Sequence, residues 1–269
     1  MLKQTKTFTV ITACITMLAL NSCQKEKLTV KNNSAFQNEE AKKVAQELAK
    51  LVWTSNSSSF VFKNGSFDCV TMTVDSISDP KTTTFDYGTG CSDEDGIVRK
   101  GIITLAYNNE DIQIAGTVVT YSFTGFFINN DEVKGTMTLE NTGLSGNGFP
   151  RLRYFVDVQD HSLVNGVTQF DSEQFFEWIE GGNTWMNDDD VFSISGFFNF
   201  STATGRQSLV TITDPLTKIN SPECEHFVKG VTQIQSTDES DRFIDYGDGT
   251  CDNLAIQTID GYSQTIELE

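Results

Sequence analysis

The stretch that decides the fold class is residues 118–139, which read VVTYSFTGFFINNDEVKGTMTL. At residues 118–123 and again at 136–139, β-branched and aromatic residues mix and alternate with polar ones, as in a half-buried strand. The intervening Asn129-Asn130-Asp131 has the composition of a hairpin turn. The stretch therefore predicts two antiparallel strands joined by a turn.

Further segments on both sides of this stretch have the same strand character, and Gly, Asn and Asp separate them. We therefore expect an all-β domain over residues 60–269, an antiparallel meander of roughly a dozen or more strands that forms a sandwich or a curved sheet. An outer-membrane barrel fits poorly, because polar residues interrupt the apolar face. The predicted strands lie at 71–74, 102–107, 154–158, 175–179, 192–197, 209–212 and 264–268.

An internal repeat is visible in residues 69–91 and 224–251. Both segments carry Asp-Tyr-Gly-x-Gly after an apolar strand, with Asp86 and Asp245 at the start of the motif. In each segment one cysteine opens a strand and a second closes the following turn. The repeat predicts a duplicated β-unit with two related halves, at about 60–160 and 161–269. The halves either share one hydrophobic core or have one core each.

The N-terminus has the pattern of an export signal. Lys3 and Lys6 precede an uncharged apolar run at residues 8–20, which has the length of a signal-peptide core and is short for a membrane span. The run ends in Leu20-Asn21-Ser22-Cys23, which resembles the lipobox of bacterial lipoproteins and implies cleavage before Cys23. The alternative is an ordinary secretory signal that happens to end at a cysteine.

This resemblance predicts a signal peptide at residues 1–22 and acyl chains such as palmitate on Cys23. Such chains anchor a protein stably to a membrane, so we expect a cell-envelope location, at the outer membrane, on either face. Residues 23–33 form a short tether. Residues 34–53 have apolar residues at helical spacing and Ser34 placed for a capping box, which predicts one amphipathic helix packed against its own domain. The alternative is a helix that lies on a membrane surface or binds a partner.

Four cysteines remain after the signal peptide and the lipidated residue are set aside, and an oxidising compartment favours two disulfides. Four cysteines allow three pairings. The repeat favours pairing within each unit. The expected disulfides are Cys69–Cys91 and Cys224–Cys251.

The charge is strongly acidic. Lys3 and Lys6 are the only charged residues of segment 1–22, so its removal changes the net charge from −18 to −20. A surface of this sign repels phosphate backbones and anionic headgroups. Nucleic-acid partners are therefore excluded, and cations are the natural counter-ligands.

A calcium site is one candidate, at Asp245, Asp248 and Asp252, where carboxylates and glycines follow one another. The spacing is not that of an EF-hand, and such turns are common in plain hairpins. Zinc is disfavoured because there is no Cys-x-x-Cys and because the only histidines, His161 and His226, read as structural residues. Apart from calcium, no cofactor is expected.

A sugar site is the second candidate, at Trp178 and Trp185, which flank a glycine-containing acidic loop. Aromatic faces stack on the C–H faces of sugars while nearby carboxylates accept hydrogen bonds. The alternative is a core tryptophan followed by a solvated loop.

No catalytic motif is present: there is no Gly-x-Ser-x-Gly elbow, no His-Glu-x-x-His helix and no glycine-rich phosphate loop before a helix. We therefore expect a non-enzymatic module that binds an envelope protein, a glycan or a cation. The alternatives are a carboxylate-based polysaccharide hydrolase, which needs a cleft with two facing carboxylates, and a periplasmic lipid carrier, which needs an apolar cavity. An aromatic exterior favours binding.

Several segments resemble uncharacterised lipoproteins of Bacteroidetes-type bacteria. These are the lipobox and residues 99–103, 189–196 and 245–252. The resemblance implies an envelope location and a repeated cysteine unit. It transfers no catalytic residue.

Overall fold

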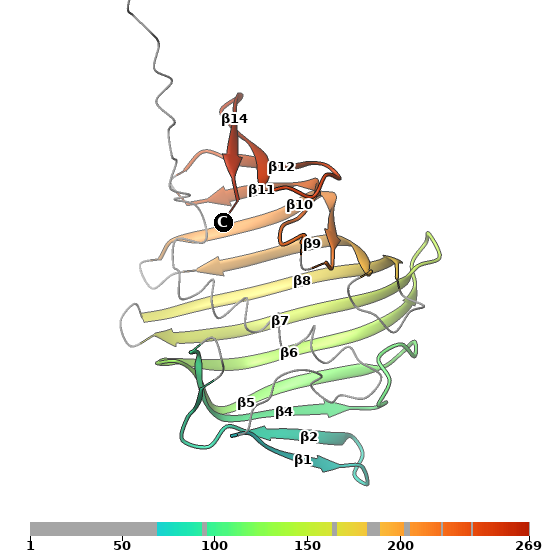
Figure 1. Ribbon diagram of the computed structural model, residues 1–269. Helices are drawn as coiled ribbons and strands as arrows, with labels where there is room; N and C mark the ends of the chain where they lie inside the picture. The colour runs from blue at the N-terminus through green and yellow to red at the C-terminus, as the bar shows by residue number, and fades with distance from the viewer. Residues whose placement is uncertain are drawn as a thin grey trace, which may run out of the picture. The chain divides into compact units, whose positions relative to one another are not determined.

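The computed structural model (Figure 1) describes residues 69–92, 96–162, 166–181, 189–201, 205–221, 223–237 and 239–268. All of them belong to one compact unit, residues 32–269. The predicted signal peptide, Cys23, the tether and the helix at 34–53 lie outside these residues. In the part that the structure describes, no helix is long and apolar enough to span a membrane.

The described residues form one antiparallel sheet of 14 strands in which each strand pairs with the next along the chain, except that β2 pairs with β4 and the short β3 joins the end of β4. Figure 1 shows this order from β1 to β14. The strands are β1 (Thr71–Asp75), β2 (Lys81–Asp86), β3 (Cys91–Ser92), β4 (Val98–Tyr107), β5 (Val118–Ile128), β6 (Asp131–Leu144), β7 (Pro150–Ser162), β8 (Gly166–Glu180), β9 (Val191–Ser201), β10 (Gln207–Ile219), β11 (Lys229–Ser236), β12 (Arg242–Asp248), β13 (Leu254–Ile259) and β14 (Tyr262–Glu267).

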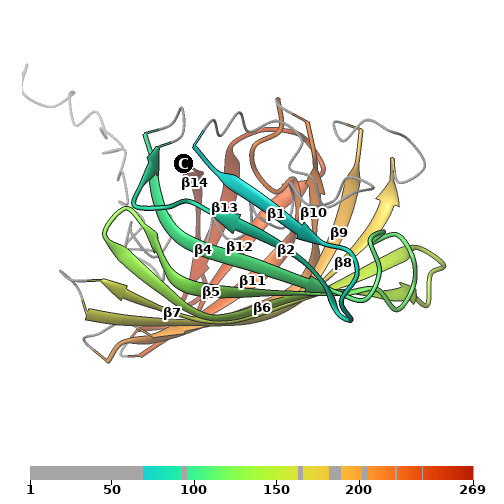
Figure 2. The same cartoon turned by 90° about the horizontal axis from the view of Figure 1, so that it is seen from below.

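The predicted all-β antiparallel meander is confirmed, and it takes the form of a single open sheet. Figure 2 shows that the long strands bend along their length, so the sheet is curved. The predicted hairpin turn at Asn129 joins β5 to β6, and Asn129 has a positive φ of 56°. Asn tolerates this left-handed conformation better than most residues do.

The two faces of the sheet differ sharply. In β5, Val119 and Tyr121 are buried while Ser122 is exposed. We call the face that carries the buried apolar side chains the inner face and the opposite one the outer face. Each large apolar side chain buried on the inner face contributes roughly 1.5–3 kcal/mol to stability. The inner-face residues include Ile103, Leu105, Val119, Tyr121, Met137, Leu139, Tyr154 and Val156.

The core continues toward the C-terminal strands. A second cluster of buried residues contains Phe200, Val210 and Ile234, and the partly buried Phe170 and Tyr246 pack against both clusters. The expected boundary at residue 160 falls inside β7, which pairs with β8 without a break from Arg151↔Glu177 to Ser162↔Gly166. The sheet therefore crosses the expected boundary between the related halves.

Both expected disulfides are present and lie within the repeated units. Cys69–Cys91 closes the β1–β2 hairpin across a sequence separation of 22, and Cys224–Cys251 closes the β11–β12 hairpin across 27. A loop of this size gives about 3 kcal/mol of stabilisation in the chain-entropy model. The two disulfides therefore fasten hairpins near the two ends of the sheet.

The repeated Asp-Tyr-Gly motif has a structural role in both units. Tyr87 is buried, and its ring centroid lies 5.7 Å from that of Phe126. Burial raises the pKa of Tyr87 to about 12. In the second unit Tyr246 packs against Phe227, with ring centroids 5.4 Å apart. The motif therefore turns the chain and places a tyrosine in the core.

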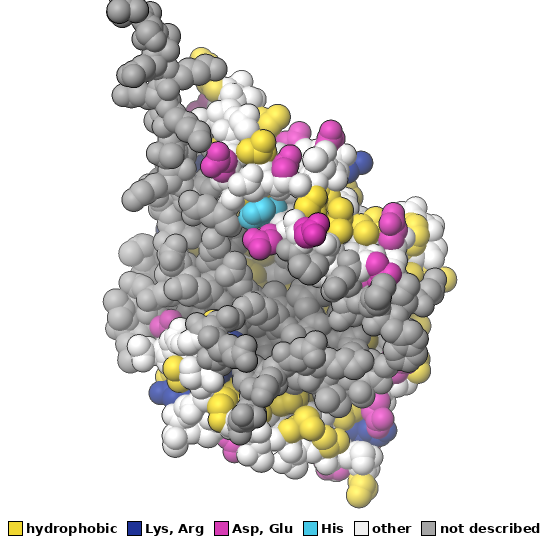
Figure 3. Space-filling model, in the orientation of Figure 1, with side chains coloured by type: hydrophobic (Ala, Val, Ile, Leu, Met, Phe, Trp, Pro, Cys, Tyr) yellow, Lys and Arg dark blue, Asp and Glu magenta, His cyan; other side chains and the backbone are white. Residues whose placement is uncertain are grey.

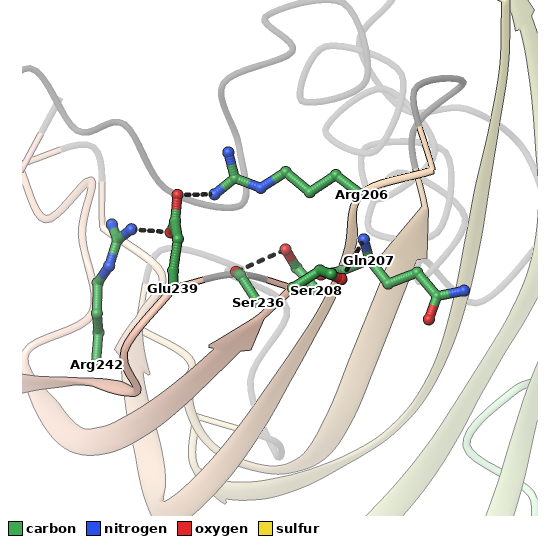
Figure 4. Close-up of polar contacts among 7 residues, drawn as sticks. Arg206, Gln207, Ser208, Ser236, Glu239 and Arg242 are labelled. Carbon is green, nitrogen blue, oxygen red and sulfur yellow. Dashed lines mark hydrogen bonds and ion pairs between the residues drawn. The ribbon is translucent and has the colours of Figure 1, made fainter.

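An arginine–glutamate cluster joins β10 to the β11–β12 connection (Figure 4). The carboxylate of Glu239 accepts a hydrogen bond from Arg206 Nη2 at 2.5 Å and is also paired with Arg242. Beside it, the hydroxyl groups of Ser208 and Ser236 lie 2.8 Å apart. These contacts hold the paired ends of β10 and β11 together.

Two glycines allow close approach of neighbouring strands on either side of the β7–β8 pair. Gly135 in β6 has φ +113°, and a Cβ there would lie 2.1 Å from the carbonyl oxygen of Asp157 in β7. Gly196 in β9 has φ +121°, and its Cβ would lie 2.1 Å from the carbonyl oxygen of Glu173 in β8. Glycine inside a strand marks a bend or a close backbone approach. The two positions therefore contribute to the curvature of the sheet.

We predict that Gly196→Ala lowers the free energy of unfolding by about 1–3 kcal/mol or more, because the added methyl group meets a carbonyl oxygen and the backbone is strained. Gly146→Ala is the matched control, since a Cβ at Gly146 meets no atom within 4 Å. The control should change stability by less than about 0.5 kcal/mol. Urea denaturation measures both variants, and equal midpoints would contradict this account of Gly196.

Candidate functional site

The predicted calcium ligands cap their own turns. Asp245 Oδ1 accepts from the backbone N–H of Gly247 at 2.9 Å, and Asp252 Oδ1 accepts from that of Leu254 at 2.9 Å. Asp248 Oδ1 accepts from the hydroxyl of Thr250 at 2.8 Å, and this bond is the main reason why the pKa of Asp248 is lowered.

The first repeated unit has the same turn, where Asp86 Oδ1 accepts from the N–H of Gly88 at 2.8 Å. Among the described residues, no group of three or more His, Cys, Asp or Glu side chains is arranged to hold a metal ion. His226 is half-buried between Cys224 and β11. The side chain of His161 lies outside the described part of the structure. The acidic motif therefore reads as a hairpin turn.

Trp178 packs against the inner-face core rather than at an open surface. Its ring stacks on that of Phe192 with centroids 5.5 Å apart, and its Nε1–H donates to Asp190 Oδ1 at 2.9 Å. Asp190 is itself buried. Trp185 lies outside the described residues, so the sugar site at Trp178 and Trp185 stays a prediction.

A different group of aromatic and acidic side chains meets on the outer face of β7, β8 and β9. Phe155 lies directly opposite Glu173, and Glu173 lies directly opposite Phe197. We call these three residues the Phe-Glu-Phe row. Phe155 and Phe197 are each 36% exposed, which is high for phenylalanine. The row presents two aromatic rings with a carboxylate between them.

Arg153 fixes the position of the central carboxylate. Its Nε lies 2.7 Å from Glu173 Oε1, its Nη1 lies 3.4 Å from Glu140 Oε2, and its guanidinium lies 5.6 Å from the Phe155 ring centroid. The hydrogen bond to Glu173 is the main cause of a raised Arg153 pKa. Such half-exposed ion pairs add little stability. The contact instead orients Glu173 beside the ring of Phe155.

A second row runs parallel to the first on the same face. Asp157 lies directly opposite Asp171, and Asp171 lies directly opposite Asn199. We call these residues the Asp-Asp-Asn row. Partial burial, and then the charge of Asp157, raise the pKa of Asp171, while a hydrogen bond from Asn199 Nδ2 to Asp171 Oδ1, at 3.5 Å, lowers it. Like charges directly opposite each other are destabilising, so this row is not explained by stability.

Both rows continue as hydroxyl groups on the neighbouring strands β5 and β6. Thr120 and Thr138 extend the Phe-Glu-Phe row, and Ser122 and Thr136 extend the Asp-Asp-Asn row. The outer face of β5–β9 therefore mixes aromatic rings with carboxylates, an amide and hydroxyls. Rings of this kind stack on flat C–H surfaces, and the polar groups form hydrogen bonds with hydroxyls.

The sequence prediction missed this site for a physical reason. Each of its residues reads as an ordinary strand residue, and no two of its members on different strands are close in the sequence. The signal that was available is the run of three consecutive apolar residues Tyr154-Phe155-Val156, in which one ring must leave the core.

The acidic character of the chain is visible on the surface. On the face drawn in Figure 3, acidic side chains gather over the upper part, around β10–β14 as labelled in Figure 1, among hydrophobic side chains. Such a surface repels anionic ligands.

Comparison with known proteins found no matching protein-family model, no matching curated protein and no matching solved structure.

We predict that Asp171→Asn stabilises the fold at pH 7 by roughly 0.2–1 kcal/mol, the size of a cross-strand charge effect. The pKa of the Asp171 carboxyl is raised in the folded state. The ionised carboxylate therefore lowers the stability of the fold at pH values above that pKa. The penalty is absent below the ordinary aspartate pKa of about 3.9.

Denaturation midpoints at pH 7 and at about pH 3 test this prediction. The gain should appear at the higher pH and vanish at the lower one. Asp214→Asn, at an exposed position of β10, is the control, with an expected change under about 0.5 kcal/mol. A gain for Asp171→Asn that is equal at both pH values would rule out the charge explanation.

Proposed function

We propose that this protein is a lipid-anchored cell-envelope lipoprotein that binds a glycan, without catalysis, on the outer face of β5–β9. The observation that carries the proposal is the Phe-Glu-Phe row, in which the exposed rings of Phe155 and Phe197 flank Glu173. The lipobox at Cys23 supports envelope anchoring. Disulfides are typical of an oxidising compartment, so Cys69–Cys91 and Cys224–Cys251 support export.

The mixture of residues on this face favours a sugar over an apolar partner. Protein interfaces have a desolvated apolar centre, whereas each exposed ring here is flanked in its row by polar side chains. Phe155 lies between Thr138 and Glu173, and Phe197 lies between Glu173 and Thr211. A sugar has both an apolar C–H face and many hydroxyls, so it matches this alternation.

A polysaccharide hydrolase is the second candidate, because Asp157 and Asp171 face each other across β7 and β8 and the pKa of Asp171 is raised. A close carboxylate pair with one raised pKa is what a retaining glycosidase uses. These two carboxylates, however, lie on an open sheet face. Glycan recovered intact after prolonged incubation supports binding, and shortened glycan supports the hydrolase.

We predict that Cys23→Ser releases the protein from the membrane, because the acyl chains on Cys23 are its anchor. Fractionation of cells that express each form should place the natural protein with membranes and the variant in the soluble envelope fraction. Metabolic labelling with a palmitate analogue should mark only the natural protein. Cys14→Ser is the matched control, and loss of labelling in that variant as well would contradict the assignment of Cys23.

We predict that Phe197→Ala weakens glycan binding about tenfold, which corresponds to about 1.4 kcal/mol, because one stacking surface is lost. A glycan array identifies ligands of the natural protein, and titration of the strongest of them measures the variant. Tyr262→Ala removes another exposed aromatic ring, on β14, and should leave binding unchanged. Equal losses in both variants would argue against a site on β7–β9.

A further inference from the structure

We propose that the ligand is a neutral, extended polysaccharide that lies across the strands, with alternate sugar units stacked on Phe155 and Phe197. This inference rests on the proposed glycan-binding function and names its substrate class and direction. It depends on the register of β7, β8 and β9, which puts Phe155, Glu173 and Phe197 in one line across the sheet.

The spacing of the two rings is the first argument. Phe155 and Phe197 are separated by two strand spacings, which is about 9–10 Å. Two sugar rings of an extended β-1,4-linked chain cover a similar length. A chain that crosses the strands therefore places one sugar over each phenylalanine and the intervening sugar over Glu173, whose carboxylate accepts hydrogen bonds from its hydroxyls.

The rigidity of the row is the second argument. Arg153 holds the Glu173 carboxylate at 2.7 Å and lies 5.6 Å from the centre of the Phe155 ring. The backbone carbonyl oxygen of Glu173 lies only 2.1 Å from where a Cβ of Gly196 would be, so β8 and β9 are in close approach at this point. A preorganised surface of this kind loses little conformational entropy when it binds.

The Asp-Asp-Asn row is the third argument. It lies two residues along each strand from the first row, which is about 7 Å, and runs parallel to it. Asp157, Asp171 and Asn199 thus offer carboxylate and amide groups along one side of a bound chain. The Phe-Glu-Phe row, extended by Thr120 and Thr138, and the Asp-Asp-Asn row beside it form a track from β5 to β9. The track is about 19 Å long, which gives room for roughly four sugars.

The charge of the track selects a neutral chain. Arg153 pairs with Glu173 and Glu140, while Asp157 and Asp171 face each other in the second row. Anionic polysaccharides meet repulsion from these carboxylates and from the net charge of the chain, −18 before removal of any signal segment. A neutral, extended, β-linked polysaccharide fits both the spacing and the charge.

The test is calorimetric titration of the full-length lipidated protein in phosphatidylcholine vesicles. The probes are β-1,4-linked oligomers of glucose, mannose and N-acetylglucosamine with two, four and six units. We expect one series to bind with an affinity that rises at least tenfold from two to four units and levels off by six. The α-1,4-linked glucose hexamer, which coils, should bind at least tenfold more weakly.

Variants then locate the chain. Phe155→Ala and Phe197→Ala should each weaken binding of the six-unit oligomer about tenfold, while the dimer is affected less. Phe155→Leu keeps apolar bulk but lacks the flat ring, and it should lose nearly as much. Tyr262→Ala should have no effect, and thermal melting of each variant shows whether it is folded.

The outcomes separate this inference from the proposed function. If a dimer binds as tightly as a tetramer, or if the coiled hexamer binds as well as the extended one, a glycan is bound but the track is wrong. If none of the three series binds while a glycan array still finds ligands, the substrate class is wrong and the proposed function stands. If the array finds no ligand at all, the proposed function itself fails.

Discussion

The register of an uninterrupted antiparallel meander is the constraint on which the rest of this structure depends. Apart from the short β3, each strand pairs with the next along the chain, so outside the β-bulges each paired side chain has a fixed partner opposite it. A slip of one residue would exchange the inner and outer faces of a strand. The burial of Val156 and Tyr154 on the inner face therefore also places Phe155 on the outer face, in line with Glu173.

Local sequence signals predicted the elements of this fold well. Alternating β-branched residues and glycine-containing turns identified the strands, and the repeated cysteine pattern identified both disulfides. The row on the outer face needed more than local signals. Phe175 and Phe176 are adjacent in the sequence, as are Phe197 and Phe198, so hydrophobicity alone does not say which ring of a pair faces the core. Only the buried partners across the sheet decide this.

At the acidic turn that begins with Asp245, the local sequence pattern predicted a calcium site. The structure gives this pattern a simpler cause, which is the geometry of the turn. A calcium loop and an aspartate-capped turn require the same residues, namely carboxylates next to glycines. Asp86 occupies the same turn in the first unit, where it accepts a hydrogen bond from Gly88. The repetition of the turn, rather than its acidity, explains why these residues occur together.

The Cys69–Cys91 disulfide has a mechanical consequence. A pulling force applied at Cys69 passes through the covalent bond to Cys91. Strands β1 and β2 lie between these cysteines in the sequence and carry none of that force. Beyond Cys91, the pairing of β3 with β4 resists this force, so a pull at Cys69 does not peel away the edge hairpin.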